Sequence, residues 1–416
     1  MRIAFVTAYP PSLVRVRAYA FVRELAREHE VTVVCACHTA REQADVAALR
    51  AQGVRVVAVR TPGWSAAAHA TGALLLGESL QVAHGAATAL RRAVGDLVAT
   101  GAIDVVHAEH LRTIASVRDL PVPVVWDAVD CISQLYELGA RHGATPMMRL
   151  IGRLEAQRAR REEQLLLHSL RHVLVTTGRD RRALRRVWEE TRSPELRRSD
   201  IAPWRAAAVH VVRNGVDLKY FIPGQWTRQA NLLVLSGKMS FHANVAAAEL
   251  LAHEIMPRIW ERRPDVRLLI AGSDPPRAVQ ALGADPRIAV TGYLSDLRPA
   301  LAGAAIAVSP TPYAVGVQNK VLEALALGTP VVAMPAAVGG LSAIAGRDLL
   351  VAGTAHSFAR TVVELLDDAY QRAALAHAGR QYVERYHSWS GAGRQLAQVY
   401  ALAIAACQHG RLDAAG

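Results

Sequence analysis

The sequence contains few cysteines and few aromatic residues. Four of its 416 residues are cysteines, and aromatic residues make up 5%. Cys35 and Cys37 are two positions apart in a strand-like run and point to the same face, but no second close pair completes a metal site. We therefore expect free, mostly buried thiols in a reducing cytoplasm, and no bound metal.

The sequence also lacks an apolar run as long as a membrane span, and its apolar start, residues 1–7, is too short for a signal peptide. We expect a cytoplasmic protein, either free or peripheral at the inner face of the plasma membrane. The net charge is +12, but the arginines are dispersed through helical segments without interleaved aromatic residues. This pattern argues against nucleic acid as a partner and favours an anionic membrane surface or a phosphorylated substrate.

The length exceeds what a single hydrophobic core usually supports, so two domains are expected. Apolar strand-like runs alternate with helical segments, which predicts an α/β protein with parallel, doubly wound sheets. We place a first Rossmann-like domain at residues 1–205, joined by a C-terminal helix at 388–416, and a second at 206–387. The proline-broken segment 194–208 is expected to link them or to lie on the surface.

The most informative stretch is residues 316–333. It predicts a loop opened by Gly316, a short helix, and a Gly-Thr-Pro turn at Gly328 into a buried strand. The helix start predicts an anion site, because free backbone amides and the helix dipole attract negative charge. Lys320 adds a positive charge, and Glu323, one turn later, can accept hydrogen bonds from a sugar diol. A diphosphate and a ribose suit this set, although a helix that merely packs would also fit.

Ligands of open parallel sheets bind beyond the carboxyl ends of the strands. In the second half, that rule selects the loops at Gly237-Lys238, Gly272 and Gly292-Tyr293. In the first half, it selects Tyr9, His107, Glu109, His110 and Asp127, with Arg15 and Arg17 opening a nearby helix. We expect two half-sites facing each other across a cleft, with a nucleotide on the C-terminal side and a second substrate on the N-terminal side.

Several motifs together resemble the GT-B glycosyltransferases of family 4. They are Asn214-Gly215-Val216-Asp217, Ser236-Gly237-Lys238-Met239 with Asn244, Ile270-Ala271-Gly272, Val290-Thr291-Gly292-Tyr293, and residues 316–332. The N-terminal run 3–34 and Trp126-Asp127-Ala128-Val129-Asp130 are similar to a subgroup associated with exopolysaccharide and exosortase-linked gene clusters. The resemblance implies a GT-B fold, with two Rossmann-like domains and a C-terminal helix that crosses back.

The resemblance also implies roles for residues. Lys238 would contact the donor diphosphate, Glu323 the ribose hydroxyls, and Tyr293 the base. The implied donor-binding residues are Gly237, Lys238, Gly272, Gly292, Tyr293, Gly316, Val317, Gln318, Asn319, Lys320 and Glu323. His110 lies near the place of a histidine that approaches the transferred sugar in relatives, with His107 as its competitor. The implied acceptor-side residues are Tyr9, Arg15, Arg17, His107 and Asp127.

Two positions on the donor side depart from the family pattern, and the first loop has Ser12-Leu13-Val14 in place of the usual glycine pair. Many relatives carry an acidic residue eight positions before the ribose glutamate, where this chain has Val315. A second phosphate-binding lysine is expected shortly after Lys238, where Ala243 and Asn244 stand, and Lys320 offers a replacement charge. The first departure leaves recognition of the donor sugar open.

Each candidate also has a structural alternative. Lys238 and Glu323 are compatible with ordinary solvated side chains, and Tyr293 with a core position. Arg15 and Arg17 fit a solvated helix face. Asp127 fits a helix cap. The arginine-rich helix at 153–161 fits a solvated helix or a membrane-docking one.

The function that we expect is transfer of a hexose or an N-acetylhexosamine from a nucleotide-diphosphate sugar to a glycan, lipid-linked or small-molecule acceptor. The resemblance implies a UDP-sugar by default, retention at the anomeric carbon, and no cofactor. A sugar-nucleotide epimerase and a non-catalytic partner subunit of the same architecture remain open. A nicotinamide-dependent dehydrogenase is disfavoured, because no Gly-x-Gly-x-x-Gly follows the first strand.

Overall fold

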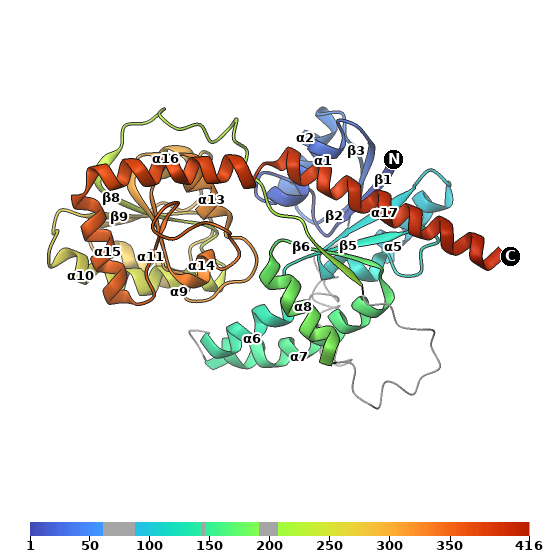
Figure 1. Ribbon diagram of the computed structural model, residues 1–416, viewed down its shortest axis with the longest axis horizontal. Coiled ribbons are helices and arrows are strands. Elements are labelled where there is room, and N and C mark those ends of the chain that lie inside the picture. Colours follow the sequence, from blue (N-terminus) through green and yellow to red (C-terminus); the bar gives the residue numbers. More distant parts are fainter. Residues whose placement is uncertain (61–87, 143–145, 191–206, 416) are drawn as a thin grey trace. The chain divides into compact units, whose positions relative to one another are not determined.

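A computed structural model describes residues 1–60, 88–142, 146–190 and 207–415. The chain forms two compact units (Figure 1). Unit 1 comprises residues 1–137, 153–213 and 389–416, and unit 2 comprises residues 138–152 and 214–388. Each unit is built on its own parallel sheet.

The sheet of unit 1 has seven parallel strands in the order β3-β2-β1-β4-β5-β6-β7. Its strands are β1 (Arg2–Thr7), β2 (Glu30–Cys37), β3 (Arg55–Arg60), β4 (Val105–Glu109), β5 (Val124–Val129), β6 (His172–Val175) and β7 (Ala208–Val211). The order reverses between β1 and β4, so the carboxyl ends of these two strands form the crevice where such sheets bind ligands.

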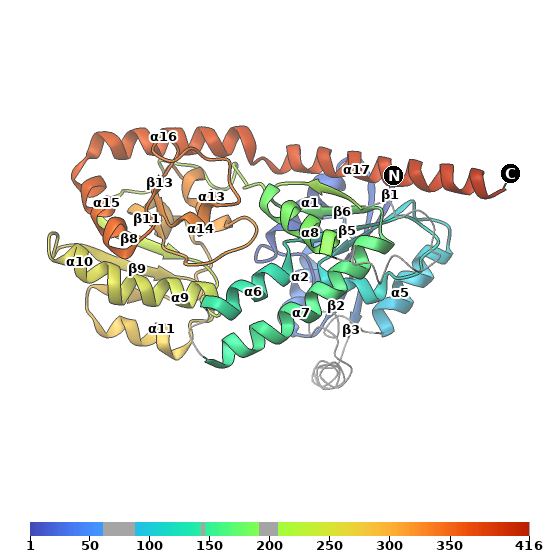
Figure 2. The ribbon, with the colours of Figure 1, turned by 60° about the horizontal axis from the view of Figure 1, so that its bottom comes forward.

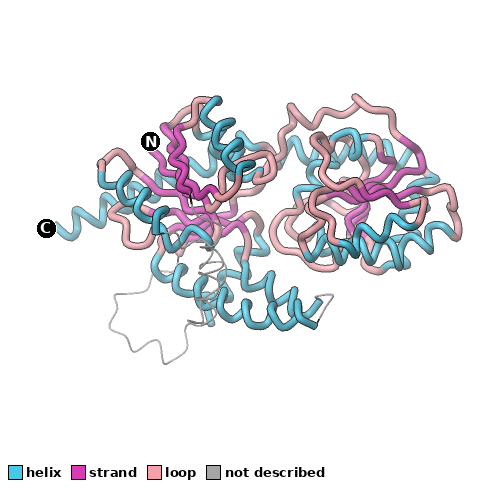
Figure 3. Tube along the Cα trace, turned by 180° about the vertical axis from the view of Figure 1, so that it is seen from behind, coloured by secondary structure: helices cyan, strands magenta, loops and turns pink. Residues whose placement is uncertain are grey.

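Helices cover both faces of this sheet, as Figure 3 shows. Alternate residues of β1 pack on opposite sides: Ala4 and Val6 on one, Ile3 and Phe5 on the other. The first side is covered by α5 (Thr88–Ala99), η1 (Leu111–Ser116), α6 (Ile132–His142), α7 (Pro146–Ser169) and α8 (Gly178–Glu190). The second side is covered by α1 (Val16–Leu25), α2 (Ala40–Ala51) and α17 (Trp389–Ala415).

The last helix, α17, packs along α1 of unit 1 (Figures 1 and 2). Its buried side chains recur at three- and four-residue spacings, from Trp389 through Leu396 to Tyr400 and Ala403. The Phe21 ring of α1 meets the Trp389 ring edge-on at 5.5 Å. The C-terminal helix thus completes the core of the N-terminal unit.

The sheet of unit 2 has six parallel strands in the order β10-β9-β8-β11-β12-β13. They are β8 (Gln229–Ser236), β9 (Arg267–Ala271), β10 (Ile288–Val290), β11 (Ala304–Ser309), β12 (Val331–Ala333) and β13 (Leu350–Val351). The order reverses between β8 and β11, so the ligand crevice of this unit is expected where those two strands end.

The helices of unit 2 also lie on both faces of its sheet. One face packs against α9 (His242–Leu250), the π-helical turn η3 (Leu251–Ile255), α10 (Met256–Trp260), α11 (Arg277–Ala281), η4 (Leu282–Ala284) and α15 (Ala355–Asp367). The other packs against α12 (Arg298–Ala302), α13 (Asn319–Ala326), α14 (Pro335–Val338) and α16 (Ala369–Tyr386). The first three of these, α9, η3 and α10, follow one another directly, so this stretch is a run of three elements with a π turn in its middle.

The predicted boundary at 205/206 comes too early. Strand β7, which lies beyond it, pairs in parallel with β6 and closes the sheet of unit 1, so the units part between Arg213 and Asn214. The sequence could not show this, because a parallel strand reads the same whichever sheet it joins. The expected linker at 194–208 falls mostly outside the described residues. All four cysteines are free thiols, and three of them are buried, as predicted.

Candidate functional site

The start of α13 lies beside the crevice of unit 2. Gly316 has a φ of +64°, which suits glycine, and Gly328 ends the segment at a φ of +66°, as the sequence predicts. Gln318, the residue before the helix, makes no side-chain hydrogen bond to the first turn. The first-turn amides therefore lack a side-chain cap, which leaves them suited to an anion.

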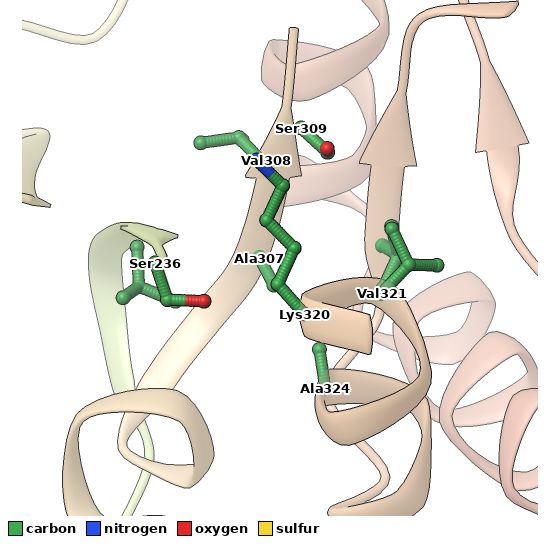
Figure 4. A pocket seen from close by; sticks show the side chains of 9 residues that line it. Ser236, Ala307, Val308, Ser309, Lys320, Val321 and Ala324 are labelled. Atoms are coloured by element: carbon green, nitrogen blue, oxygen red, sulfur yellow. The ribbon is translucent and has the colours of Figure 1, made fainter. Parts of the chain in front are cut away.

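Lys320 lies at the carboxyl ends of β8 and β11. Its side chain runs along β11 toward Val308 and Ser309, with Ser236 of β8 on the neighbouring strand (Figure 4). The small pocket around it is lined by Val234, Ser236, Ala307, Val308, Ser309, Lys320, Val321, Ala324 and Val331. Apart from the two serines and the lysine, this lining is apolar, so the ammonium is the dominant polar group there.

Glu323 stands one turn after Lys320 on the same helix, and both side chains are half-buried. Burial lowers the pKa of Lys320 to about 8, against the opposing attraction of Glu323. Burial likewise raises the pKa of Glu323 to about 7, and Lys320 partly offsets this rise. Both groups therefore titrate near neutral pH, as groups in binding and catalytic sites often do.

The glycines predicted for the donor side come together at the ends of β8, β9 and β10. The amide of Gly237 donates to Ala271 O at 3.1 Å, and the amide of Gly272 donates to Gly292 O at 3.1 Å. A Cβ on Gly272 would lie 1.7 Å from Gly237 O, so only glycine fits this approach. Tyr293, just beyond, is 57% exposed and does not occupy the core.

Lys238 is exposed at the carboxyl end of β8. Its backbone oxygen accepts a hydrogen bond from Asn244 Nδ2 at 2.9 Å, and Asn244 Oδ1 accepts one from Lys320 Nζ at 2.6 Å. The sequence marked Asn244 as part of a family motif and as standing where a lysine was expected, whereas the structure shows that it joins the two lysine-bearing segments. The feature of the sequence that could have indicated this contact is the presence of a polar residue at the start of the helix after β8.

Two further contacts hold the loop before α13. Asn214 Nδ2 donates to Asn319 Oδ1 at 3.0 Å, which ties the helix start to the first residues of unit 2. Tyr313, 2% exposed, shares a hydrogen bond of 2.7 Å with His242 Nδ1. Val315, where an acidic residue was expected from the resemblance, is buried, at 8% exposed. Sequence spacing does not predict these contacts, since their partners are distant along the chain.

In unit 1, His107 belongs to the core. It is fully buried and stacked on Phe5, with ring centroids 4.0 Å apart, and its Nδ1 shares a hydrogen bond of 2.8 Å with the Tyr400 hydroxyl. Burial lowers the pKa of His107 to about 4, so the ring is neutral near pH 7. His107 therefore joins β4 to α17.

Arg17 and Asp127 form a buried ion pair, which differs from both interpretations of the sequence. Arg17 Nε lies 2.7 Å from Asp127 Oδ2, and the two side chains are 6% and 1% exposed. Arg17 also donates to Val212 O at 3.0 Å. Arg17 is therefore not on a solvated helix face. The pair joins α1, β5 and the segment after β7.

His110 lies just beyond the carboxyl end of β4 and has a φ of +66°, which is uncommon outside glycine. Its amide donates to Asp127 O at 2.7 Å, while its Nδ1 is buried without a hydrogen-bond partner among the described residues. Burial, with a smaller contribution from Arg112, lowers the pKa of His110 to about 3. Burial, with a smaller contribution from Asp127, raises the pKa of the neighbouring Glu109 to about 7.

Tyr9 and Arg15 lie together at the carboxyl end of β1. The Arg15 guanidinium carbon lies 4.3 Å from the centre of the Tyr9 ring, and its Nη2 lies 3.0 Å from Glu42. Arg112, which the sequence did not single out, donates to the Tyr9 hydroxyl at 3.2 Å. Unit 1 thus has a polar group of side chains around Tyr9, with two arginines.

The second sheet lies within a region that matches a known family. Residues 230–368 match the model described as Glycosyl transferases group 1. This stretch runs from β8 through α15 and includes Lys238, Tyr293, Lys320 and Glu323. The match therefore covers the predicted donor side.

Two curated relatives are similar over part of their length. One is the GDP-mannose-dependent monoacylated alpha-(1-6)-phosphatidylinositol monomannoside mannosyltransferase of Corynebacterium glutamicum, 31% identical over 156 residues, which are 35% of this chain and 41% of the relative. The other is the D-inositol 3-phosphate glycosyltransferase of Salinispora tropica, 39% identical over 131 residues, 30% of this chain and 26% of the relative. The matches thus span less than half of either relative.

The whole chain has the fold of a solved structure. Sucrose-phosphate synthase from Thermosynechococcus elongatus superposes with a TM-score of 0.70 at 17% identity, over 97% of this chain and 99% of that one. The chain therefore has the GT-B fold, with two parallel-sheet Rossmann-like domains and a C-terminal helix that packs on the N-terminal one. The fold class predicted from the sequence is confirmed.

Proposed function

We propose that the protein is a glycosyltransferase that moves a sugar from a nucleotide-diphosphate sugar to an acceptor hydroxyl. The observation that carries this proposal is the start of α13, where uncapped amides, Lys320 and Glu323 meet at the topological switch point of unit 2. The family match over residues 230–368 supports it. The narrower relation to the exopolysaccharide-associated subgroup remains a prediction from the motifs.

In this proposal unit 2 holds the donor. The diphosphate lies on the amides that follow Gly316, between Lys238 and Lys320, and Glu323 accepts hydrogen bonds from the ribose hydroxyls. Tyr293, exposed beside Gly292, lies against the base. As the glycosidic bond breaks, negative charge grows on the leaving diphosphate, and the two cations and the helix dipole stabilise it.

On the acceptor side, we propose His110 rather than His107 for contact with the transferred sugar. Each histidine has one ring nitrogen without a hydrogen-bond partner among the described residues, but His110 lies half-buried beyond a strand end, whereas His107 is fully buried. Tyr9 and Arg15 remain acceptor-side candidates, with Arg112 added. Arg17 and Asp127 act at most by holding the strand ends in place. Retention at the anomeric carbon stays part of the proposal.

Calorimetric titration with UDP, GDP, ADP, dTDP and NAD tests the proposal. We expect one nucleoside diphosphate to bind selectively and NAD not to bind. Uridine is our default base, while the name of one relative makes GDP the strongest competitor. Binding of no nucleoside diphosphate would favour a non-catalytic partner subunit. Conversion of a sugar nucleotide without any acceptor would favour an epimerase.

We also propose that α7 docks on an anionic membrane. Its exposed side chains include Met147, Leu150, Ile151 and Leu154, which recur at three- and four-residue spacings and are 45–63% exposed. All the exposed charges on this helix are arginines, because Glu155 and Glu163 are buried and Glu162 is half-buried against Arg118. Such an apolar face edged by arginines suits anionic lipid. Among the described helices, none is long and apolar enough to cross a membrane.

Replacing Leu150 and Leu154 together with glutamate should release the protein from phosphatidylglycerol vesicles. The substitutions remove apolar contact and add charge that the lipid repels, so we expect the sedimenting fraction to fall several-fold. Leu402→Glu combined with Tyr370→Glu is the control, because both residues are exposed on other helices. Equal sedimentation of both double variants, or equal binding to phosphatidylcholine vesicles, would contradict this role.

A further inference from the structure

The side chain of Asn244 joins two segments that each carry a lysine. Its Nδ2 donates to the backbone oxygen of Lys238 at 2.9 Å, and its Oδ1 accepts from Lys320 Nζ at 2.6 Å. The two bonds fix which way the amide points, since only the oxygen can accept from an ammonium. The Lys320 ammonium is therefore held toward the loop that follows β8.

The backbone around Asn244 leaves room for this contact. A Cβ on Gly237 would lie 2.9 Å from Asn244 Nδ2, so glycine is needed where the amide approaches the loop. Asn244 itself is 8% exposed, in the first turn of α9. A buried amide that bonds at both ends is a rigid support, because each unpaired polar atom would cost free energy.

We propose that Asn244 is a positioning residue that brings the Lys320 ammonium to the side of Lys238, so that two cations from different segments bind one diphosphate. The inference rests on the donor site proposed above. In this arrangement α13 supplies the second cation that binds the diphosphate, because the helix after β8 carries no lysine. A diphosphate carries more than one negative charge, and a single exposed lysine at a strand end would neutralise it incompletely.

The ionisation of Lys320 provides a test that distinguishes a role in diphosphate binding from a purely structural contact. Strands β8, β11 and β12 contribute no ionisable side chain to the lining around it. The nearby ionisable groups are Lys238 after β8, His242 at the start of α9, and Glu323 on α13 itself. Burial lowers the pKa of Lys320 to about 8, and a bound diphosphate would raise that pKa again. Affinity should therefore fall as the pH rises above about 8.

The experiment measures the dissociation constant of the nucleoside diphosphate that binds best, by calorimetry between pH 7 and 9.5. We expect Lys320→Gln to weaken binding by about tenfold or more and to abolish the loss of affinity above pH 8. Asn244→Ala should weaken binding less, because the ammonium remains but is no longer held. The exchange variant Asn244→Lys with Lys320→Asn should recover most of the affinity, since a cation again faces Lys238.

Asn214→Ala is the control, because Asn214 holds the start of α13 through Asn319, the residue before Lys320. It should keep the wild-type loss of affinity above pH 8. If Lys320→Gln and Asn244→Ala bind as tightly as wild type, or if the exchange variant recovers nothing, this inference is overturned while the donor site stands. Failure of the wild-type protein to bind any nucleoside diphosphate overturns the donor site and this inference together.

Discussion

Replacing Asp127 with alanine is expected to lower the free energy of unfolding by about 3–5 kcal/mol. The Arg17 guanidinium, 6% exposed, would remain buried without its counter-ion. The amide of Val129 would also lose its bond to Asp127 Oδ1, at 3.1 Å. Thermal unfolding followed by circular dichroism measures the loss, at about 2–4 °C for each kcal/mol.

The matched control is Asp104→Ala. Asp104 also pairs with an arginine, Arg2, but those side chains are 29% and 43% exposed. Water screens this pair, so its loss should cost about 0–1 kcal/mol. If Asp127→Ala melted at the wild-type temperature, the buried pair would not stabilise unit 1. Arg17→Met should be milder than Asp127→Ala, because methionine fills part of the space, although it leaves a carboxylate unpaired.

Replacing Glu323 with alanine is expected to weaken nucleoside-diphosphate binding by about 10- to 100-fold. Hydrogen bonds to a charged group contribute about 1.5–3 kcal/mol each, and the carboxylate is the proposed partner of the ribose hydroxyls. Calorimetric titration of the variant measures the change. Glu364→Ala is the control, since that side chain is 62% exposed on α15 of the same unit. An affinity of Glu323→Ala equal to that of the control would remove Glu323 from the site.

The pH dependence of this binding has a definite sign. The pKa of Glu323 in the free protein is raised to about 7, so the group is largely protonated below that pH. Hydroxyl donors favour the ionised carboxylate, so affinity should rise as the pH increases through 7. Glu323→Gln should lose this rise while keeping the shape of the side chain. Because the same nucleotide is used throughout, its own ionisation cancels in the comparison.

Local pattern was sufficient for the segment around α13. Gly316 and the Gly-Thr-Pro turn at Gly328 predicted a loop, a short helix and a turn into a buried strand, and the structure has all three. The alternation of helices and strands likewise predicted two parallel, doubly wound sheets. These features depend on residues that are near one another in the chain. The proposed roles of Lys320 and Glu323 remain predictions to be tested by binding.

Long-range pairing decided the rest. Arg17 and Asp127 are 110 positions apart, and no periodicity in the sequence shows that they meet in the core. His107 is buried in the core beside Tyr400 of the last helix, whereas His110, three positions later in the chain, lies beyond the strand end. The contact between Asn244 and Lys320 likewise joins two residues that are far apart in the chain. The sequence by itself determined which elements form and where strands end, because those depend on local propensity and spacing. Only the tertiary structure decided which polar side chains are buried against one another, because burial depends on segments that the chain brings together from far apart.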